Sequence, residues 1–525
     1  MPGTMRGVYT NLTDIRRRVF AEVAKLAYAK DDSVEEVAAK ADNLPYEILP
    51  GDVATYRESV FLERAIISER IRLAMGLPLQ DVDKPQKISE GLEEAAKPET
   101  YYEPPLINII KFACNACQDN VYEVTNFCQG CLAHPCREVC PKQAISFVNK
   151  RAFIDQEKCV KCGMCASVCP YQAIHHHVRP CAEACGMHAI GSDENGRADI
   201  DYEKCVSCGQ CLVNCPFGAI ADKSQLFQVI KAIGDGERVI AAVAPAFVGQ
   251  YGGRGNIGKL KGMFAQLGFA GVEEVAVGAD LCTVQEARDF LDEVPEKLEF
   301  MGTSCCPAWA SMAKKEFPDH ACNISMANTP MVLEARLIRS LHPDAKIVFV
   351  GPCSAKKLEA MRKSVRSEVD FVLTFEEMAG MMAAKGIEYL ELEDDNKSDF
   401  DVASADGRGF AVSGGVAQAV ANQIKHDHPD VEVKTFAAEG LDDCRAMMKK
   451  AVKGQYKGYL LEGMACPGGC VAGPGTLGNV RKTSALVKSY ARRASRSVAG
   501  DDINVSELQN LEGAVMAEAV KRDAE

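Results

Sequence analysis

Four thiols in the second half of this chain have the types and spacing to hold one iron–sulfur cluster. They come from the segments TSCCPAW (residues 303–309), GPCSAKK (351–357) and EGMACPGGC (462–470), and they are Cys306, Cys353, Cys466 and Cys470. Thiolates are soft donors that suit iron, and a cubane cluster needs four of them. Cys305 lies directly beside Cys306 and is left over, so its thiol is free to carry a proton instead of holding iron.

Sixteen further cysteines between residues 114 and 215 are enough for four more 4Fe–4S clusters. Three quartets each end in Cys-Pro and run into a short apolar turn. They are Cys128, Cys131, Cys136 and Cys140; Cys159, Cys162, Cys165 and Cys169; and Cys205, Cys208, Cys211 and Cys215. The pattern "CP..AI" followed by "ID..KC" occurs twice, before Cys159 and before Cys205, and this internal repeat pairs the motifs.

In two-cluster ferredoxins the last cysteine of one motif completes the cluster of its partner, and this rule divides the ligands. In the first unit we expect one cluster on Cys128, Cys131, Cys136 and Cys169, and another on Cys159, Cys162, Cys165 and Cys140. In the second unit Cys185 would complete Cys205, Cys208 and Cys211. Cys181 and Cys215 then need two more ligands, and Cys114 with Cys117 is the spare pair upstream. The alternative is that Cys114 and Cys117 are free thiols.

The amino-acid composition disfavours some classes of partner and some cellular locations. The chain has 525 residues, 24 cysteines and a net charge of −13, which disfavours nucleic acid or an anionic membrane as partner. Runs of CxxCxxCxxxCP in a long chain are typical of cluster ligands rather than of disulfides, so we expect a reducing cytoplasm. No run of 18 or more apolar residues occurs, so we expect no membrane span.

The pattern of residue types along the chain predicts four regions. Residues 1–100 are helical, either a docking or dimerisation module or a helical cap packed on the cluster domain. Residues 101–225 are a ferredoxin-like α+β domain with up to four 4Fe–4S clusters. Residues 226–490 alternate β-branched runs with amphipathic helices, which predicts α/β structure with mainly parallel sheets and chemistry at the carboxyl ends of strands. We expect residues 491–525 to form a C-terminal helical tail.

The three cysteine segments resemble the cluster-binding signatures of the FeFe-hydrogenases, and they occur in that family's order over residues 239–480. The resemblance implies two mainly parallel sheets flanked by helices around an active-site cluster. It also implies the reversible interconversion of H2 with protons and electrons. Cys306, Cys353, Cys466 and Cys470 would hold a 4Fe–4S cubane. Cys470 would also bridge the cubane to a di-iron subcluster carrying CO, cyanide and azadithiolate ligands.

The same resemblance assigns roles to residues around the cluster. Lys356 would hydrogen-bond a cyanide ligand, and Pro245 and Met464 would line the subcluster. Protons would pass through four residues whose side chains can each donate and accept when protonated. These are Cys305, Glu286, Ser325 and Asp289. The competing interpretations are a surface lysine at position 356, and a solvated helix face for the two carboxylates, which are spaced three apart.

At several positions this sequence differs from the family's best-studied members. In these differences it resembles the family's less-characterised second group, group B. Gly351 stands where those members have methionine, and Cys282 stands where they commonly have threonine. Cys282, Cys322 and Cys444 lie outside the signatures, and we expect them to be buried small apolar residues, although Cys282 could be a redox-active thiol near the site.

The leading hypothesis is a hydrogenase that exchanges electrons with ferredoxin, or a similar small carrier, through the amino-terminal clusters. It would need hydrogenase maturation proteins to receive the di-iron unit. One alternative is a hydrogen-sensing homologue of low turnover, which commonly carries a signalling domain. The other is a non-catalytic iron–sulfur assembly protein, which the presence of Cys305 and Lys356 disfavours.

Overall fold

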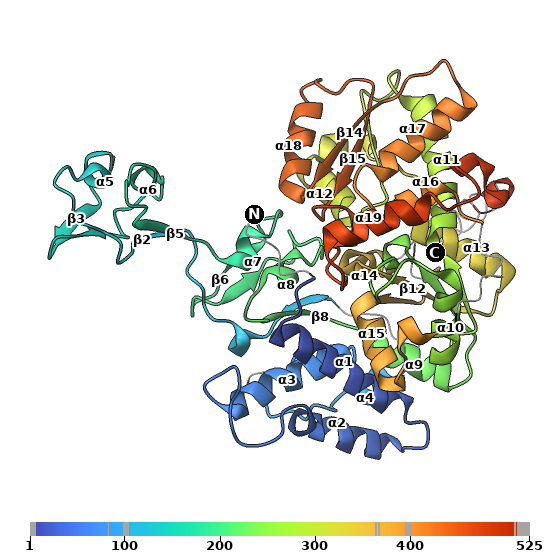
Figure 1. The fold of residues 1–525 in the computed structure, drawn as a ribbon, viewed down its shortest axis with the longest axis horizontal. Coiled ribbons are helices and arrows are strands. Elements are labelled where there is room, and N and C mark those ends of the chain that lie inside the picture. Colours follow the sequence, from blue (N-terminus) through green and yellow to red (C-terminus); the bar gives the residue numbers. More distant parts are fainter. Residues whose placement is uncertain are drawn as a thin grey trace.

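The computed structural model describes residues 7–81, 83–97, 104–362, 365, 368–393, 402–508 and 511. These residues form an N-terminal helical layer, two ferredoxin-like units and an α/β part with two parallel sheets (Figure 1). This architecture confirms the predicted fold class. Within the described ranges, no helix combines the length and the apolar character that crossing a bilayer requires.

The first sheet of the α/β part has four parallel strands in the order β10-β9-β12-β13. Its strands are β9 (Val239–Val243), β10 (Gly271–Glu274), β12 (Lys346–Gly351) and β13 (Phe371–Thr374). The continuous apolar runs of β9 and β12 suit central strands of a parallel sheet, which are covered on both faces.

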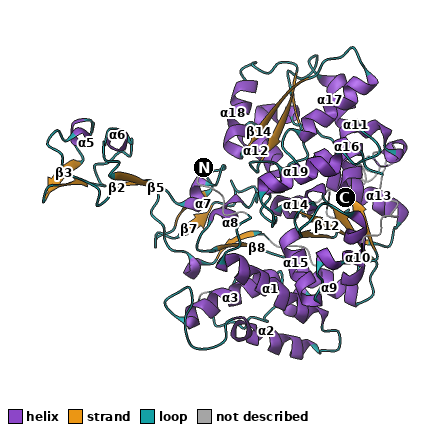
Figure 2. Ribbon diagram, in the orientation of Figure 1, coloured by secondary structure: helices purple, strands orange, loops and turns teal. Residues whose placement is uncertain are grey.

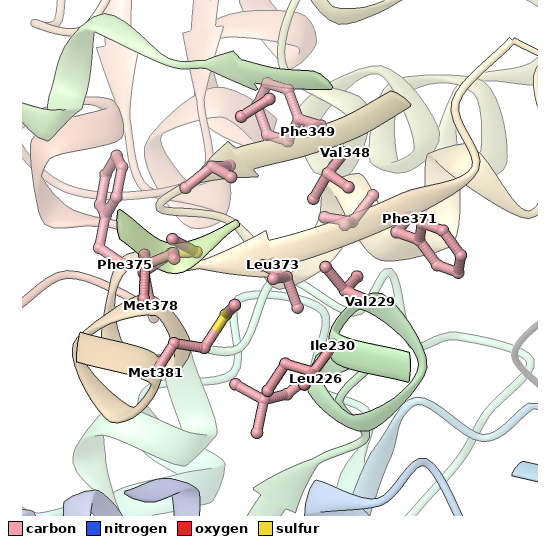
Figure 3. Close-up of a cluster of buried hydrophobic side chains, with 14 of the residues drawn as sticks. Leu226, Val229, Ile230, Val348, Phe349, Phe371, Leu373, Phe375, Met378 and Met381 are labelled. Atoms are coloured by element: carbon pink, nitrogen blue, oxygen red, sulfur yellow. The ribbon is translucent and has the colours of Figure 1, made fainter. Parts of the chain in front are cut away.

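Helices cover this sheet and complete its core. They are α9 (Leu226–Gly234), α10 (Ile257–Leu267), α13 (Pro330–Leu341) and α15 (Phe375–Lys385). Figure 3 shows Leu226 and Ile230 of α9 beside Met381 of α15, with Leu373 of β13 above them. This packing fixes where the strands end, and therefore where the loops that follow them begin.

The second sheet has three parallel strands in the order β11-β15-β14. They are β11 (Met301–Gly302), β14 (Lys434–Glu439) and β15 (Tyr459–Met464), covered by α12 (Pro307–Glu316), α17 (Gly415–Asp427) and α18 (Leu441–Ala451). Helix α11 (Val275–Glu293) packs against α13 on one side and α17 on the other, so it links the two halves. Figure 2 shows the strands enclosed by these helices.

The two ferredoxin units are nested. In the first unit β2 pairs with β5 and β3 with β4, and in the second β1 pairs with β8 and β6 with β7. The strands are β1 (Ile107–Ile109), β2 (Val121–Val124), β3 (Ile145–Val148), β4 (Arg151–Ile154), β5 (Ile174–His177), β6 (Ile190–Ser192), β7 (Ala198–Ile200) and β8 (Ile220–Asp222). The whole first unit, residues 121–177, is therefore inserted into the second between Cys117 and Cys181.

Arg179 stabilises the point of insertion. It is 3% exposed, and its guanidinium donates to Cys117 O at 2.9 and 3.1 Å, to Gly191 O at 2.7 Å and to Gly196 O at 2.9 Å. These bonds tie the chain before the insertion to the chain after it. Figure 1 shows that the first unit projects from the molecule, whereas the second lies between it and the α/β part.

The N-terminal helices pack on both neighbouring parts. They are α1 (Asn11–Tyr28), α2 (Val34–Ile48), α3 (Val60–Ala74) and α4 (Leu92–Ala95). Helix α1 packs against α9 and α15, and α3 packs against β8. The layer therefore covers the α/β part as well as the second ferredoxin unit, which is a wider contact than a cap on the cluster domain.

Helix α19 (Val480–Ala491) is followed by two short 3-10 helices, at Ala499–Asp501 and Ile503–Glu507. The described part of residues 491–525 thus contains short helical turns packed on α11. The rest of that expected tail lies outside the described residues.

Candidate active site

Parallel strands deliver the four cysteines of the second half of the chain to one cavity. Cys306 follows β11 and precedes α12, Cys353 follows β12, and Cys466 and Cys470 follow β15. A cavity of about 90 Å³ lies where these loops meet. Its lining includes Pro245, Cys305, Cys306, Cys353, Lys356, Met464, Cys466 and Cys470. The strand-end rule for α/β sheets accounts for this convergence.

The chemistry of this thiol set fits a bound iron–sulfur cluster. Burial raises the pKa of Cys353 to about 11, and the neighbouring Cys306 thiol adds to that shift. Burial also raises the pKa of Cys306 and Cys470, while backbone N–H groups of Ala465 and Trp309 oppose the shift at Cys306. A bound cluster would displace these protons, because thiols bind metal as thiolates. No three His, Cys, Asp or Glu side chains in the described residues are grouped to bind a single ion.

The loop between Cys466 and Cys470 approaches its neighbours closely. Gly468 and Gly469 have φ of +101° and +85°, a region that L side chains rarely adopt. A Cβ on Gly469 would lie 2.5 Å from the backbone N of Ser413. The two glycines therefore let Cys470 turn into the cavity.

Lys356 is a buried residue, not the surface lysine of the competing interpretation. It is 8% exposed, and its Nζ donates to Glu359 Oε2 at 2.6 Å. Burial opposes its charge, yet its pKa is raised because Glu359 attracts the ammonium and accepts its hydrogen bond, with help from Cys353 and Cys305. Lys356 thus keeps a positive charge at the wall of the cavity.

Behind Cys305 lies a buried carboxyl group. Glu286 of α11 is 0% exposed, and its Oε1 accepts the backbone N–H of Ser304 at 2.9 Å and the Ser304 hydroxyl at 3.1 Å. Burial raises its pKa to about 7, while these bonds and the nearby Ser325 hydroxyl lower it. Its Oε2 is buried without a partner at standard geometry within the described residues. Glu286 is therefore not part of a solvated helix face.

The outer part of the expected proton route reaches solvent. Asp289, one turn beyond Glu286, has a side chain 30% exposed and lies 3.8 Å from Arg288 Nε. Burial raises the pKa of Cys305, and the Glu286 carboxylate adds to that shift. Cys305 therefore holds its proton at neutral pH, and Glu286 titrates between it and the surface.

The three cysteines outside the signatures differ in their exposure to solvent. Cys282 and Cys444 are buried as expected, whereas Cys322 is exposed, so its predicted burial is wrong. Cys322 lies in a short 3-10 helix, Pro318–Asn323, after α12. Cys282 lies close enough to Cys305 and Glu286 to affect the pKa of Cys305, so this thiol is near the site.

In the first ferredoxin unit the structure groups cysteines as the repeat predicts. The thiols of Cys131, Cys169 and Cys128 help to raise the pKa of Cys136, and those of Cys159 and Cys140 help to raise the pKa of Cys165. Cys162 is exposed. The pairing of the motifs, made from spacing, therefore agrees with which thiols lie near one another.

The second unit groups its cysteines in the same way. Burial raises the pKa of Cys181 to about 12, and the thiols of Cys215, Cys114 and Cys117 surround it. The thiols of Cys185, Cys205, Cys208 and Cys211 act on one another. Cys208 also lines the cavity, where the thiol of Cys353 contributes to its raised pKa. The second unit thus reaches the candidate active site directly.

The sequence did not predict that two polar residues, Ser304 and Gln210, belong to the site. Ser304 holds Glu286, and its position beside Cys305 was the available signal. Gln210 Nε2 donates to Cys466 Sγ at 3.1 Å. Its signal was weaker, since it is an ordinary residue within the CGQC segment, and the partner lies 256 residues away.

Family models match three stretches of the chain. Residues 237–474 match the C-terminal domain of the iron only hydrogenase large subunit, residues 152–175 match a 4Fe–4S binding domain, and residues 177–226 match the LdpA Fe–S cluster-binding domain. Iron–sulfur cofactors are therefore part of this protein.

Two relatives found by sequence share less than a third of their aligned residues with this chain. Iron hydrogenase 1 of Clostridium pasteurianum is 29% identical over 425 residues, which is 70% of this chain and 73% of that protein. The human nuclear prelamin A recognition factor is 25% identical over 267 residues, 41% of this chain and 58% of that protein. An apo FeFe-hydrogenase structure from Chlamydomonas reinhardtii covers 52% of this chain and 89% of its own, at 21% identity and a TM-score of 0.44.

Proposed function

We propose that this divergent FeFe-hydrogenase-like protein is an oxidoreductase that interconverts H2 with protons and electrons. One observation carries the proposal. The non-ligand thiol of Cys305 lines the same cavity as four candidate cluster ligands, with the titrating carboxyl of Glu286 buried behind it. A protein that only stored or assembled clusters would not need a proton-carrying pair at this position.

Cys306, Cys353, Cys466 and Cys470 would hold a 4Fe–4S cubane, and Cys470 would also contact a di-iron unit with CO, cyanide and azadithiolate ligands. When bound, that unit supplies the open metal position and the base that split H2 into two protons and two electrons. Pro245 and Met464 would exclude water from its surroundings, since both are apolar and line the cavity. The Lys356 ammonium would stabilise an anionic ligand there.

The chain's own residues would move the proton. Cys305 holds a proton at the cavity wall, because its pKa is raised. Glu286 accepts or returns that proton, since its pKa of about 7 makes both protonation states available at neutral pH. Ser325 and the partly exposed Asp289 would complete the route to solvent.

Electrons would travel through four 4Fe–4S clusters, two in each ferredoxin unit. The three thiols around Cys181 support the cluster on Cys114, Cys117, Cys181 and Cys215. The set Cys185, Cys205, Cys208 and Cys211 would be the last before the cavity, because Cys208 lines it. The projecting first unit would be the first to receive electrons.

The surface of the first unit suits an acidic carrier such as ferredoxin. Large apolar side chains on it are exposed, including Leu132 at 97%, Phe127 at 72% and Val160 at 53%. Residues 121–177 have six Lys or Arg and four Asp or Glu, a net +2 in a chain whose total is −13. Lys161 lies beside the exposed Cys162. Exposed apolar side chains on a unit with a net positive charge favour an acidic protein that must approach a cluster closely.

Infrared spectroscopy of protein matured anaerobically with hydrogenase maturation proteins tests the proposal. CO and cyanide bands together with H2 production from a reduced artificial donor are the expected result. Cys470→Ser is the control and should lose both the bands and the turnover while keeping the ferredoxin-unit clusters. Bands with very slow turnover would favour a hydrogen sensor. Absence of bands in fully iron-loaded protein would overturn the proposal in favour of a non-catalytic iron–sulfur assembly protein.

A further inference from the structure

Gln210 contacts both sides of the junction between the second ferredoxin unit and the cavity. It is the first residue of α8 (Gln210–Asn214) and lies between Cys208 and Cys211. Its backbone N–H donates to the thiol of Cys208, and its side-chain Nε2 donates to Cys466 Sγ at 3.1 Å. One residue thus hydrogen-bonds a sulfur from each of two cysteine sets.

The residue before Gln210 packs closely against the α/β part. Gly209 has φ of +74°, and a Cβ there would lie 2.6 Å from Pro474 Cγ and 3.2 Å from Ser354 Oγ. Ser354 in turn donates to Asp222 Oδ2 at 3.2 Å, and the fully buried Lys357 Nζ binds the same oxygen at 2.9 Å. The second ferredoxin unit and the α/β part are therefore held in close contact, which keeps the amide of Gln210 within hydrogen-bond distance of Cys466.

The internal repeat provides a reference for this position. The first unit has CGMC where the second has CGQC, so Met164 is the counterpart of Gln210. Both residues begin a short helix after a glycine with positive φ, 76° at Gly163 and 74° at Gly209. Met164 is 46% exposed. Because the ferredoxin unit forms with methionine at this position, the amide at 210 is not required by that fold.

We propose that Gln210 is a positioning residue that raises the reduction potential of the cubane on Cys306, Cys353, Cys466 and Cys470. This inference rests on the cubane of the proposed function. An N–H group that donates to a ligand sulfur stabilises the cluster state with the extra negative charge, which is the reduced state. Gln210 thereby favours electron transfer from the cluster on Cys208 to the cubane.

The test uses protein produced without maturation proteins, so that it carries 4Fe–4S clusters and no di-iron unit. The midpoint potential of the cubane is measured by a redox titration followed by electron paramagnetic resonance. The cubane signal is identified as the one missing in Cys353→Ser. In Gln210→Met and Gln210→Glu we expect a tenfold or greater fall in the reduced-to-oxidised ratio at a fixed potential, which is a shift of about 59 mV to more negative values.

Met164→Gln is the matched control, since it places the same amide at the counterpart position, and the cubane potential should not change. An unchanged potential in Gln210→Met and Gln210→Glu overturns the inference while leaving the proposed function intact. Loss of the cubane signal in both variants, with the other clusters retained, also overturns it, because Gln210 would then be needed for assembly. Failure to find any Cys353-dependent signal in the parent protein refutes the cubane itself.

Discussion

The backbone N–H of Ala198 donates a hydrogen bond to Cys114 Sγ at 3.3 Å. In the first ferredoxin unit Ala152 donates in the same way to Cys128 Sγ at 3.4 Å. Ala198 is the first residue of β7 and Ala152 the second residue of β4, and each of these strands is the second strand of its unit's inner hairpin. Cys114 thus occupies in the second unit the place that Cys128, a member of a full quartet, occupies in the first. This equivalence is the strongest structural support for a fourth cluster.

Replacement of Cys114 and Cys117 together by alanine should remove about four iron atoms per chain, the content of one 4Fe–4S cluster. Iron analysis after anaerobic reconstitution measures this loss. The infrared bands of the matured protein should persist, because neither residue lines the cavity. Iron content equal to that of the parent protein would mean that both thiols are free.

Cys305→Ala should leave the metal site assembled and lower H2 turnover by a factor of about 10²–10⁴ or more, because the first proton carrier is lost. Infrared spectra and activity with a reduced artificial donor are measured on the same preparation. Cys305→Asp should keep more activity than the alanine variant, since a carboxyl can also carry a proton. Intact bands with an undiminished rate in Cys305→Ala would show that protons enter elsewhere.

The pH dependence of turnover should follow Glu286, whose pKa burial raises to about 7. H2 production needs the protonated carboxyl as donor, so its rate should fall as the pH rises through 7. H2 oxidation needs the carboxylate as acceptor, so its rate should rise over the same range. Glu286→Gln should lower both rates and remove this dependence. A parent profile that is flat between pH 6 and 8 would contradict the assignment.

Charge reversal at the first ferredoxin unit should weaken the carrier complex. Lys161→Glu is expected to raise the KM for an acidic ferredoxin several-fold at low salt, with less difference at high salt, because rim charges act on association. Activity with a small artificial donor should be unchanged. Lys449→Glu, on the exposed side of α18, is the matched control. Equal KM values for the two variants would exclude this surface as the docking site.

Several features of the site could be predicted from particular residues. The strand IVFVGPC predicted that Cys353 follows a buried strand, and β12 ends at Gly351. The repeat around Cys159 and Cys205 predicted which thiols lie together. The spacing of residues was informative in both cases because each feature depends only on local structure, within a few residues along the chain.

Other features depended on contacts between distant parts of the chain. Spacing three apart left Glu286 and Asp289 equally compatible with a solvated face, and packing of α11 between α13 and α17 decides that Glu286 is buried. The exposure of Cys322 is a similar case, because no local pattern says which side of the turn after α12 meets solvent. Burial depends on what packs against an element, and its own residues do not contain that information.

By itself the sequence determined the identity and order of the candidate cluster cysteines, because ligand type and short-range spacing are properties of the chain. The tertiary structure decided that Arg179 ties the chain before the first ferredoxin unit to the chain after it. It also decided that Gln210 reaches Cys466, a residue 256 positions away. Such contacts arise when separately formed units pack, and the free energy that fixes them is spread over the whole interface.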